Sequence, residues 1–253
     1  MNNPKSILIT GASSGIGEAL ALEYAAPGAF LALTGRDAQR LEGVAAAARA
    51  KGATVETKVI DVVDRAGMTA WLQQLDAGHP LDLAIANAGV GLEGDHKLPE
   101  EEAMRGTFAI NIDGVMNTVL PLLSAFRARK RGQIAIMASL ASFIGLPQSA
   151  AYNGSKAAVR VWGESLRHSL RKDGIEVNVI CPGFVVSRMT ARNKFPMPFL
   201  MQADKAARII RSGLARNKPR IAFPFGTKAA VWLGITLPGA WTDRLMQGGP
   251  RAK

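Results

Sequence analysis

Short apolar segments alternate with longer helical segments from the start of the chain to Ser187. Six segments are apolar and often β-branched, as is typical of strands buried on both faces of a sheet. They are residues 5–10, 30–35, 54–60, 81–86, 133–138 and 175–180. Segments with helical spacing lie between them, at residues 15–26, 38–50, 99–129 and 149–172. This alternation predicts an α/β fold with a doubly wound parallel sheet and helices on both faces.

The alternation ends after Phe184. A segment rich in Met, Phe and Pro, residues 195–201, precedes one more predicted helix and a short predicted strand at residues 220–223, which brings the sheet to about seven strands. A chain of 253 residues fits a single α/β domain. We expect residues 1–187 to form the cofactor-binding and catalytic core, residues 188–225 to bind the substrate, and residues 226–253 to form a basic and apolar extension.

The composition indicates a reducing compartment. The single cysteine, Cys181, has no partner for an internal disulfide. The first residues run directly into the first predicted strand, which leaves no room for a signal peptide. The best candidate for a membrane span, residues 229–241, is shorter than the about 20 residues required and contains Pro238. We expect a cytoplasmic protein, with peripheral attachment to the inner face of a membrane as the alternative.

Residues 10–17, with the sequence TGASSGIG, end the first predicted strand and open the first predicted helix. Glycines let the backbone approach a pyrophosphate, and the helix N-terminus offers unpaired N–H groups. A tight turn without a ligand is the alternative, but the position after the first strand favours a dinucleotide. The expected cofactor contacts in this loop are Gly11, Ser13, Ser14, Gly15, Ile16 and Gly17.

The end of the second predicted strand bears on the choice of cofactor. Many dinucleotide-binding folds place an acid there for the ribose hydroxyls, whereas in this chain Arg36 follows Gly35. A guanidinium pairs with a 2′-phosphate that a carboxylate would repel. The sequence therefore predicts NADP(H). The alternative is NAD(H), with Asp37 binding the ribose.

Tyr152 and Lys156 lie four residues apart in a predicted helix and so project from one face. An ammonium near a phenol stabilises the phenolate and lowers the phenol pKa, which makes proton transfer feasible at neutral pH. A surface Tyr and Lys at this spacing is the alternative, and the pair alone is a weak signal.

Together with the motifs around them, these residues resemble the short-chain dehydrogenase/reductase family over residues 5–187. The resemblance rests on TGASSGIG at 10–17, on Asn87, Ala88 and Gly89, on Asn111 opening N-x-x-G, on Ser139 thirteen residues before Tyr152, on Y-x-x-x-K at 152–156, and on Pro182 with Gly183. It implies a single Rossmann-like domain. Ala138 departs from a serine common in the family, and Ser187 from a threonine.

The resemblance also implies roles for individual residues. Tyr152 would exchange a proton with the substrate oxygen, which Ser139 would hold. Lys156 would bind the nicotinamide ribose and lower the Tyr152 pKa, and Asn111 would hold a water that links Lys156 to solvent. Further cofactor contacts would come from Asp61 and Val62 at the adenine, from Asn87, Ala88 and Gly89 near the adenosine ribose, and from Pro182, Gly183 and Ser187 at the nicotinamide. Asp61 as a cap of the following helix is the alternative for that residue.

The formal net charge of +11 lies entirely in the last quarter of the chain. Residues 188–253 contain 13 Lys or Arg and only two acids, whereas residues 1–187 contain 18 charges of each sign. A solvated basic surface is the simplest explanation. Docking on an anionic membrane and recognition of an acidic partner, such as an acyl carrier, are the alternatives. No nucleic-acid-reading element accompanies the charge.

The predicted function is NADP(H)-dependent hydride transfer with a carbonyl or secondary alcohol, of lipophilic or acyl type. Two other classes stay open: a non-catalytic NADP-binding regulator, and an epimerase or dehydratase acting on a nucleotide sugar. The long helices at 99–129 and 149–172 are similar to those that pair relatives, so we expect a homodimer or homotetramer. His79, His96 and His168 have no ligand spacing, and no metal site is predicted.

Overall fold

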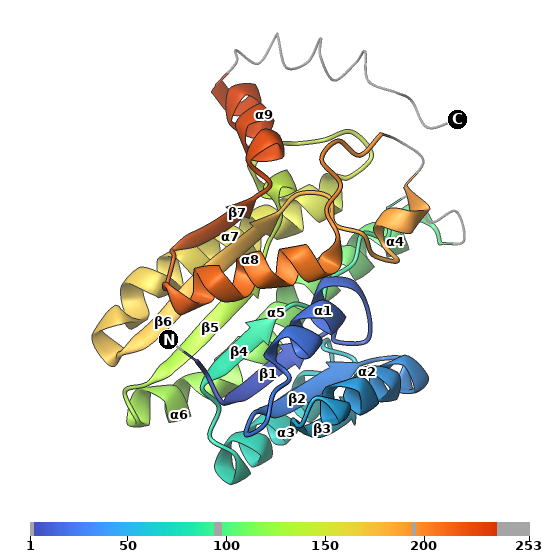
Figure 1. The fold of residues 1–253 in the computed structure, drawn as a ribbon. Coiled ribbons are helices and arrows are strands. Elements are labelled where there is room, and N and C mark those ends of the chain that lie inside the picture. The colour runs from blue at the N-terminus through green and yellow to red at the C-terminus, as the bar shows by residue number, and fades with distance from the viewer. Residues whose placement is uncertain (1–2, 94–97, 194–195, 237–253) are drawn as a thin grey trace.

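The computed structural model describes residues 3–93, 98–193 and 196–236. This part of the chain forms a seven-stranded parallel sheet in the order β3-β2-β1-β4-β5-β6-β7 (Figure 1). The strands are β1 (Ser6–Thr10), β2 (Phe30–Gly35), β3 (Thr54–Val59), β4 (Leu83–Ala86), β5 (Gly132–Met137), β6 (Ile175–Pro182) and β7 (Arg220–Phe223). The predicted fold class is confirmed, and the strand limits differ from those predicted by at most two residues.

One strand prediction is wrong in its burial. β3 was expected to be buried on both faces, but most of its side chains are exposed or half-buried, and Val59 is exposed. The reason is its place at the end of the strand order, where β2 is its neighbour on one side. An edge strand tolerates the polar side chains that this segment carries.

Helices cover both faces of the sheet. Residues of α1 (Gly15–Tyr24), α2 (Ala38–Ala50) and α8 (Ala203–Ala215) form the core on one face. Residues of α3 (Arg65–Gly78), α5 (Gly114–Val119), α6 (Leu123–Ala128) and α7 (Ala150–Leu170) form it on the other. α9 (Phe225–Thr236) follows β7 and projects beyond the sheet (Figure 1).

Helix α3 lies where a helix was expected after Asp61, although its limits were not predicted. It begins after Asp64, whose carboxylate accepts a hydrogen bond from the Gly67 N–H and so caps the helix. Asp64, and not Asp61, therefore serves as the cap. The buried side of α3 consists of Met68, Trp71, Leu72 and Leu75.

The helix predicted over residues 99–129 is not uniformly α-helical. α4 (Glu100–Phe108) passes into a π-helical turn, Ala109–Asp113, before α5, and a 3₁₀ turn, Leu120–Leu122, separates α5 from α6. Pro121 lies in the 3₁₀ turn and interrupts the α-helical hydrogen bonding. The π turn contains Asn111, so the irregularity falls at a predicted site residue.

Residues 100–128 also form the helical stretch that, among the described residues, is long and apolar enough by length and composition to span a membrane. Residues 229–241 were expected to be the best candidate, and residues 237–241 of that segment lie outside the described residues. The stretch packs against α3, β4 and α7 within the domain. Core helices of compact proteins pass the same test of length and composition.

The strand order reverses between β3 and β4, because the chain crosses from one edge of the sheet back to its centre. In open α/β sheets, ligands bind at the carboxyl ends of the strands beside such a reversal, which in this chain lies between β1 and β4. The loops after β1 and β4 carry the TGASSGIG sequence and Asn87, Ala88 and Gly89.

Candidate active site

The loop after β1 approaches the loop after β4 so closely that two of its glycines have no room for a side chain. Gly11 has a φ of +65°, and a Cβ there would lie 2.8 Å from the Cα of Ala88. A Cβ on Gly17 would overlap the carbonyl oxygen of Gly11. The sequence therefore needs glycine at both positions to form this turn.

The N-terminus of α1 is open toward this loop. Ser14 occupies the N-cap position in an extended conformation, and its side chain makes no capping hydrogen bond with the described residues. Backbone N–H groups of a helix's first turn lack partners inside the helix. This arrangement, with the glycine cradle, fits the phosphates of a dinucleotide.

Asn87 and Ala88 form hydrogen bonds with the loop after β1, residues 10–17, which is called the phosphate loop below. The backbone N–H groups of both residues donate to Oγ1 of Thr10, each at 3.1 Å. The Asn87 amide also donates to the carbonyl oxygens of Thr10 at 2.9 Å and Gly11 at 3.2 Å. The structure thus gives Asn87 a role in joining β1 to β4, and its expected contact with a ribose stays a prediction.

Arg36 and Asp37 have different surroundings at the end of β2. The Arg36 side chain is 60% exposed, and its Nη1 lies 3.6 Å from Oδ2 of Asp61. The Asp37 carboxylate accepts from the Arg40 N–H, which caps α2, and forms an ion pair with the Arg40 side chain. Both side chains therefore have an ionic partner within the protein and remain partly exposed, Arg36 more so than Asp37.

The amide of Asn111 is fully buried and joins three segments. Its Oδ1 accepts from the Val90 N–H at 2.8 Å, and its Nδ2 donates to the Val90 carbonyl and to Oγ of Ser155, both at 2.9 Å. Val90 follows the Asn-Ala-Gly motif, and Ser155 lies on α7 beside Lys156. Asn111 therefore sets the position of both neighbours.

Lys156 is buried between β5 and the loop after β4. Its Nζ donates to the Met137 carbonyl at the end of β5, at 2.9 Å. A Cβ on Gly89 would lie 2.9 Å from Nζ of Lys156 and 3.0 Å from Oδ1 of Asn111. The structure thus places Gly89 against both Lys156 and Asn111. Burial lowers the pKa of Lys156 to about 8.

Ser139 joins the end of β5 to the end of β6 and contacts Tyr152. Its hydroxyl donates to the Pro182 carbonyl at 3.4 Å and accepts from the Ala141 N–H at 3.1 Å. Burial raises the pKa of the Tyr152 phenol, and a hydrogen bond with Ser139 acts in the opposite direction. Nζ of Lys156 lies 5.9 Å from the centre of the Tyr152 ring.

This geometry corrects one expectation. Lys156 was expected to hold the pKa of Tyr152 below its ordinary value, but desolvation of the phenol is the larger effect and the shift is upward. The physical reason is that both groups are buried and the ammonium itself is destabilised. Tyr152 therefore keeps its proton at neutral pH in this structure.

The segment after β6 returns to the phosphate loop. The Gly183 N–H donates to the Phe223 carbonyl, and the Ser187 N–H donates to Oγ1 of Thr190. A Cβ on Gly15 would lie 3.0 Å from the Cβ of Ser187. Pro182 and Ser187 thus connect Ser139 to the loop at residues 10–17. The contact of Pro182, Gly183 and Ser187 with a nicotinamide stays a prediction.

Val62 lies within the core against α5. It is buried, a Cβ on Gly114 would meet its side chain, and its carbonyl accepts from the Asn117 amide at 2.9 Å. The contact of Asp61 and Val62 with an adenine stays a prediction. His79 stacks on Phe30 with ring centres 4.1 Å apart, and His96 lies outside the described residues.

Glu93 belongs to the site, although no motif in the sequence identifies it. Its two carboxylate oxygens accept from the backbone N–H groups of Ala151 at 2.7 Å and Tyr152 at 2.8 Å. It thereby caps α7 at the turn that carries Tyr152, where the helix dipole favours a negative charge. No local signal marks it, because its partners lie almost 60 positions away in the sequence.

We expect Glu93→Ala to lower the melting temperature by several degrees, because loss of a helix cap costs about 1 kcal/mol. Turnover should fall severalfold because the first turn of α7 orients Tyr152. Thermal unfolding and steady-state kinetics test both effects. Glu101→Ala is the control, since it removes an exposed carboxylate that pairs with Arg105 on α4. Equal effects of the two substitutions would contradict the role of Glu93.

The pKa of Lys156 predicts a pH dependence of stability. Between pH 8 and 9 the unfolded chain retains a proton at Lys156, whose ordinary pKa is 10.5, while the folded protein has largely released it. The free energy of unfolding should therefore rise by about 1 kcal/mol between pH 8 and pH 9.

Urea unfolding at pH 8 and pH 9 measures this rise in the unliganded protein. We expect Lys156→Met to abolish the contribution and the exposed control Lys172→Met to keep it. The pKa of Cys181, which burial raises to about 12, gives an opposite slope that wild type and Lys172→Met share. An equal pH slope in wild type and Lys156→Met would contradict the assignment.

Comparison with known proteins gives consistent matches. The family model described as short chain dehydrogenase matches residues 5–196. An uncharacterized oxidoreductase of Myxococcus xanthus is 38% identical over 240 residues, covering 94% of this chain and 95% of the relative.

Two solved structures illustrate the similarity of fold. A short-chain dehydrogenase from Sphingobium yanoikuyae in complex with NADPH is 25% identical, with a TM-score of 0.80 over 98% of this chain and 97% of that chain. A short chain dehydrogenase from Mycobacterium paratuberculosis bound to NAD is 24% identical, with a TM-score of 0.77 over 90% of this chain and 98% of that chain.

Proposed function

The chain belongs to the short chain dehydrogenase family, and on that premise we propose that it is an NADP(H)-dependent oxidoreductase acting on a carbonyl or secondary alcohol. The observation that carries the proposal is the meeting of Ser139, Tyr152, Lys156 and Asn111 at the carboxyl edge of the sheet. Segments far apart in the sequence contribute these side chains, so chance spacing does not explain them.

The residues at this edge fit a dinucleotide. The glycine cradle and the open N-terminus of α1 would hold the pyrophosphate, and the exposed Arg36 would pair with a 2′-phosphate. The segment around Ser187 would flank the nicotinamide. When bound, the cofactor supplies or accepts the hydride.

The protein's own chemistry is proton transfer at the substrate oxygen. In carbonyl reduction the Tyr152 hydroxyl donates its proton to that oxygen, and its raised pKa keeps the proton in place until the oxygen becomes basic. The Ser139 hydroxyl orients the oxygen. Lys156, with a pKa of about 8, carries an ammonium in much of the population at neutral pH and binds the ribose hydroxyls.

Apolar side chains beside the site favour a lipophilic substrate. Val186, Met189, Phe199 and Leu200 are exposed on the segment that follows β6. Exposed apolar groups at the rim of a site gain free energy when a ligand covers them. Each additional methylene in the substrate should therefore raise kcat/KM, by about fourfold when it is fully covered.

We expect wild-type protein to oxidise NADPH with a panel of ketones of increasing alkyl length, and Tyr152→Phe to lower kcat by about 10² to 10⁴. Cofactor affinity, measured by quenching of protein fluorescence, should stay unchanged in the variant. Full activity of Tyr152→Phe would remove Tyr152 from the mechanism. Tight NADPH binding without turnover in wild type would favour the non-catalytic regulator.

Arg36→Ala should lower kcat/KM for NADPH by about 10- to 100-fold, the range expected for one lost charge-assisted hydrogen bond. The value for NADH should change much less, because NADH lacks the 2′-phosphate. Kinetics with both cofactors check this, with Arg49→Ala at the far end of α2 as the control. A wild-type preference for NADH would overturn the cofactor assignment.

The expected pairing into a homodimer or homotetramer stays a prediction. Phe108, Leu120 and Val161 are exposed apolar side chains on the helices named for that pairing, which agrees with the expectation. The expected cytoplasmic location and the epimerase or dehydratase alternative also stay predictions.

A further inference from the structure

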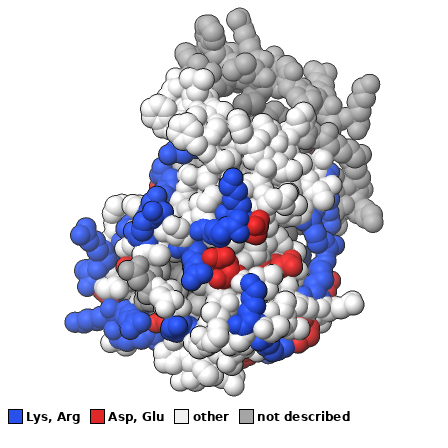
Figure 2. Space-filling view, viewed as in Figure 1, with Lys and Arg blue, Asp and Glu red and all other residues white. Residues whose placement is uncertain are grey.

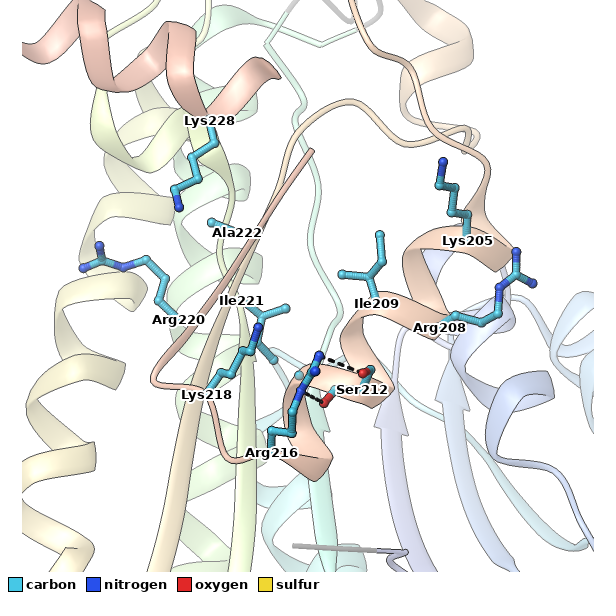
Figure 3. Close-up of a pocket in the computed structure, with 11 residues that line it drawn as sticks. Lys205, Arg208, Ile209, Ser212, Arg216, Lys218, Arg220, Ile221, Ala222 and Lys228 are labelled. Carbon is cyan, nitrogen blue, oxygen red and sulfur yellow. Dashed lines mark hydrogen bonds between the residues drawn. The ribbon is translucent and has the colours of Figure 1, made fainter. Parts of the chain in front are cut away.

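A basic groove lies between α8, β7 and α9, outside the candidate active site. It has a volume of about 600 Å³, and its lining contains six Lys or Arg side chains and no Asp or Glu. Figure 3 shows that they come from α8, from the turn after it, from β7 and from α9, and that the Arg208 and Arg220 head groups point away from the centre of the groove. They are Lys205, Arg208, Arg216, Lys218, Arg220 and Lys228.

Acids at the rim offset only part of this charge. Arg208 pairs with Asp204 at 2.9 Å, and Arg220 pairs with Glu164. Arg216 donates to the hydroxyl and carbonyl of Ser212, which are neutral groups. The groove therefore keeps a net positive charge and has the electrostatics of an anion-binding surface.

An apolar stripe on α9 adjoins the groove. Phe225, Trp232 and Leu233 are 81%, 67% and 63% exposed. Positions 225 and 232 lie two turns apart on one face, and Lys228 lies between them at the i+3 and i−4 positions. The same helix face thus carries a groove cation and large apolar side chains. Figure 2 shows the uncharged surface of α9 beside Lys and Arg side chains over α8 and β7.

Contacts with the domain hold α9 in place. It packs against β7 and against the turn Leu140–Phe143, which follows Ser139. A Cβ on Gly226 would overlap the ring of Phe199, and a Cβ on Gly234 would lie 3.3 Å from Cδ1 of Ile144. The exposed stripe is therefore fixed relative to the site.

A second copy of the chain would not fit this surface well. A two-fold interface centred on the groove would bring the cations of both copies close to one another, which is unfavourable. An anionic bilayer offers the complementary pattern, with phosphates at the level of the cations and an apolar interior for Trp, Phe and Leu.

We propose that the groove and the α9 stripe together dock the protein onto an anionic membrane surface. The groove cations contact lipid phosphates, and Phe225, Trp232 and Leu233 enter the interface. Because α9 contacts the turn after Ser139, docking places the candidate active site close to the bilayer. The proposal concerns binding alone and holds whether or not the proposed reaction is correct.

Vesicle co-sedimentation of the full chain tests the proposal. We expect binding to mixed vesicles of phosphatidylcholine and phosphatidylglycerol to be at least tenfold stronger than to phosphatidylcholine alone, and to weaken at high salt. Each groove cation near the surface contributes about fivefold, so Lys218→Glu/Lys228→Glu should lower the partition coefficient at least tenfold. Phe225→Ser/Trp232→Ser should lower it by a similar factor.

The matched control is Lys58→Glu/Lys172→Glu, which makes the same charge change at exposed positions elsewhere in the molecule. We expect it to bind anionic vesicles within about twofold of wild type. Melting curves of all variants show whether each remains folded, and the substituted side chains on α9 are exposed, so folding should persist. In a variant whose other tryptophans are replaced by Phe, the fluorescence comes from Trp232 alone. We expect its emission maximum to shift to shorter wavelength when the protein binds vesicles.

Several outcomes would overturn the proposal. Equal binding of the control and groove variants would mean that net charge alone acts, and unaltered binding of Phe225→Ser/Trp232→Ser would mean that the stripe stays outside the bilayer.

Competition by soluble glycerophosphate without vesicle binding would assign the groove to a free phosphate. Loss of a dimer in Phe225→Ser/Trp232→Ser, seen by light scattering, would assign the stripe to a second copy. Binding to an acyl carrier protein, but not to vesicles, would assign the groove to an acidic protein.

Discussion

The buried amide of Asn111 holds together the parts on which the candidate chemistry depends. Its three hydrogen bonds connect a π-helical turn, the backbone after the Asn-Ala-Gly motif, and α7. A buried amide with lost partners costs free energy, so these segments keep their relative position. Gly89, in the same backbone segment, has no side chain and so leaves room for both Lys156 and Asn111. The irregular helix is therefore part of how the site is built.

Much of the fold and site followed from the sequence because the relevant signals are local. Strand composition and turn residues predicted the sheet, and the reversal of strand order then brought the ends of β1 and β4 together. Helical spacing placed Tyr152 and Lys156 on one face, and the glycine sequence at 10–17 predicted a sharp turn, in which Gly11 and Gly17 have no room for a side chain. Residues joined by short-range geometry were therefore predictable.

The features that escaped prediction depend on distant partners or on burial. Glu93 meets α7 across a long stretch of intervening sequence, and the cap of α3 is Asp64 where the sequence had suggested Asp61. The exposure of β3 reflects its place in the strand order, which local composition does not encode. The direction of the Tyr152 pKa shift depends on desolvation, which is known only once the surrounding elements are packed.

The uneven charge of the chain has a consequence for its motion before any contact is made. Acids and bases balance over residues 1–187, and the groove cations gather at the β7 edge of the sheet, opposite the β3 edge. The excess positive charge of the groove therefore lies away from the centre of the sheet, toward β7. In the field of a negatively charged surface the molecule experiences a torque within about 10 Å, the screening length at 0.1 M salt. It would therefore arrive with its β7 edge leading.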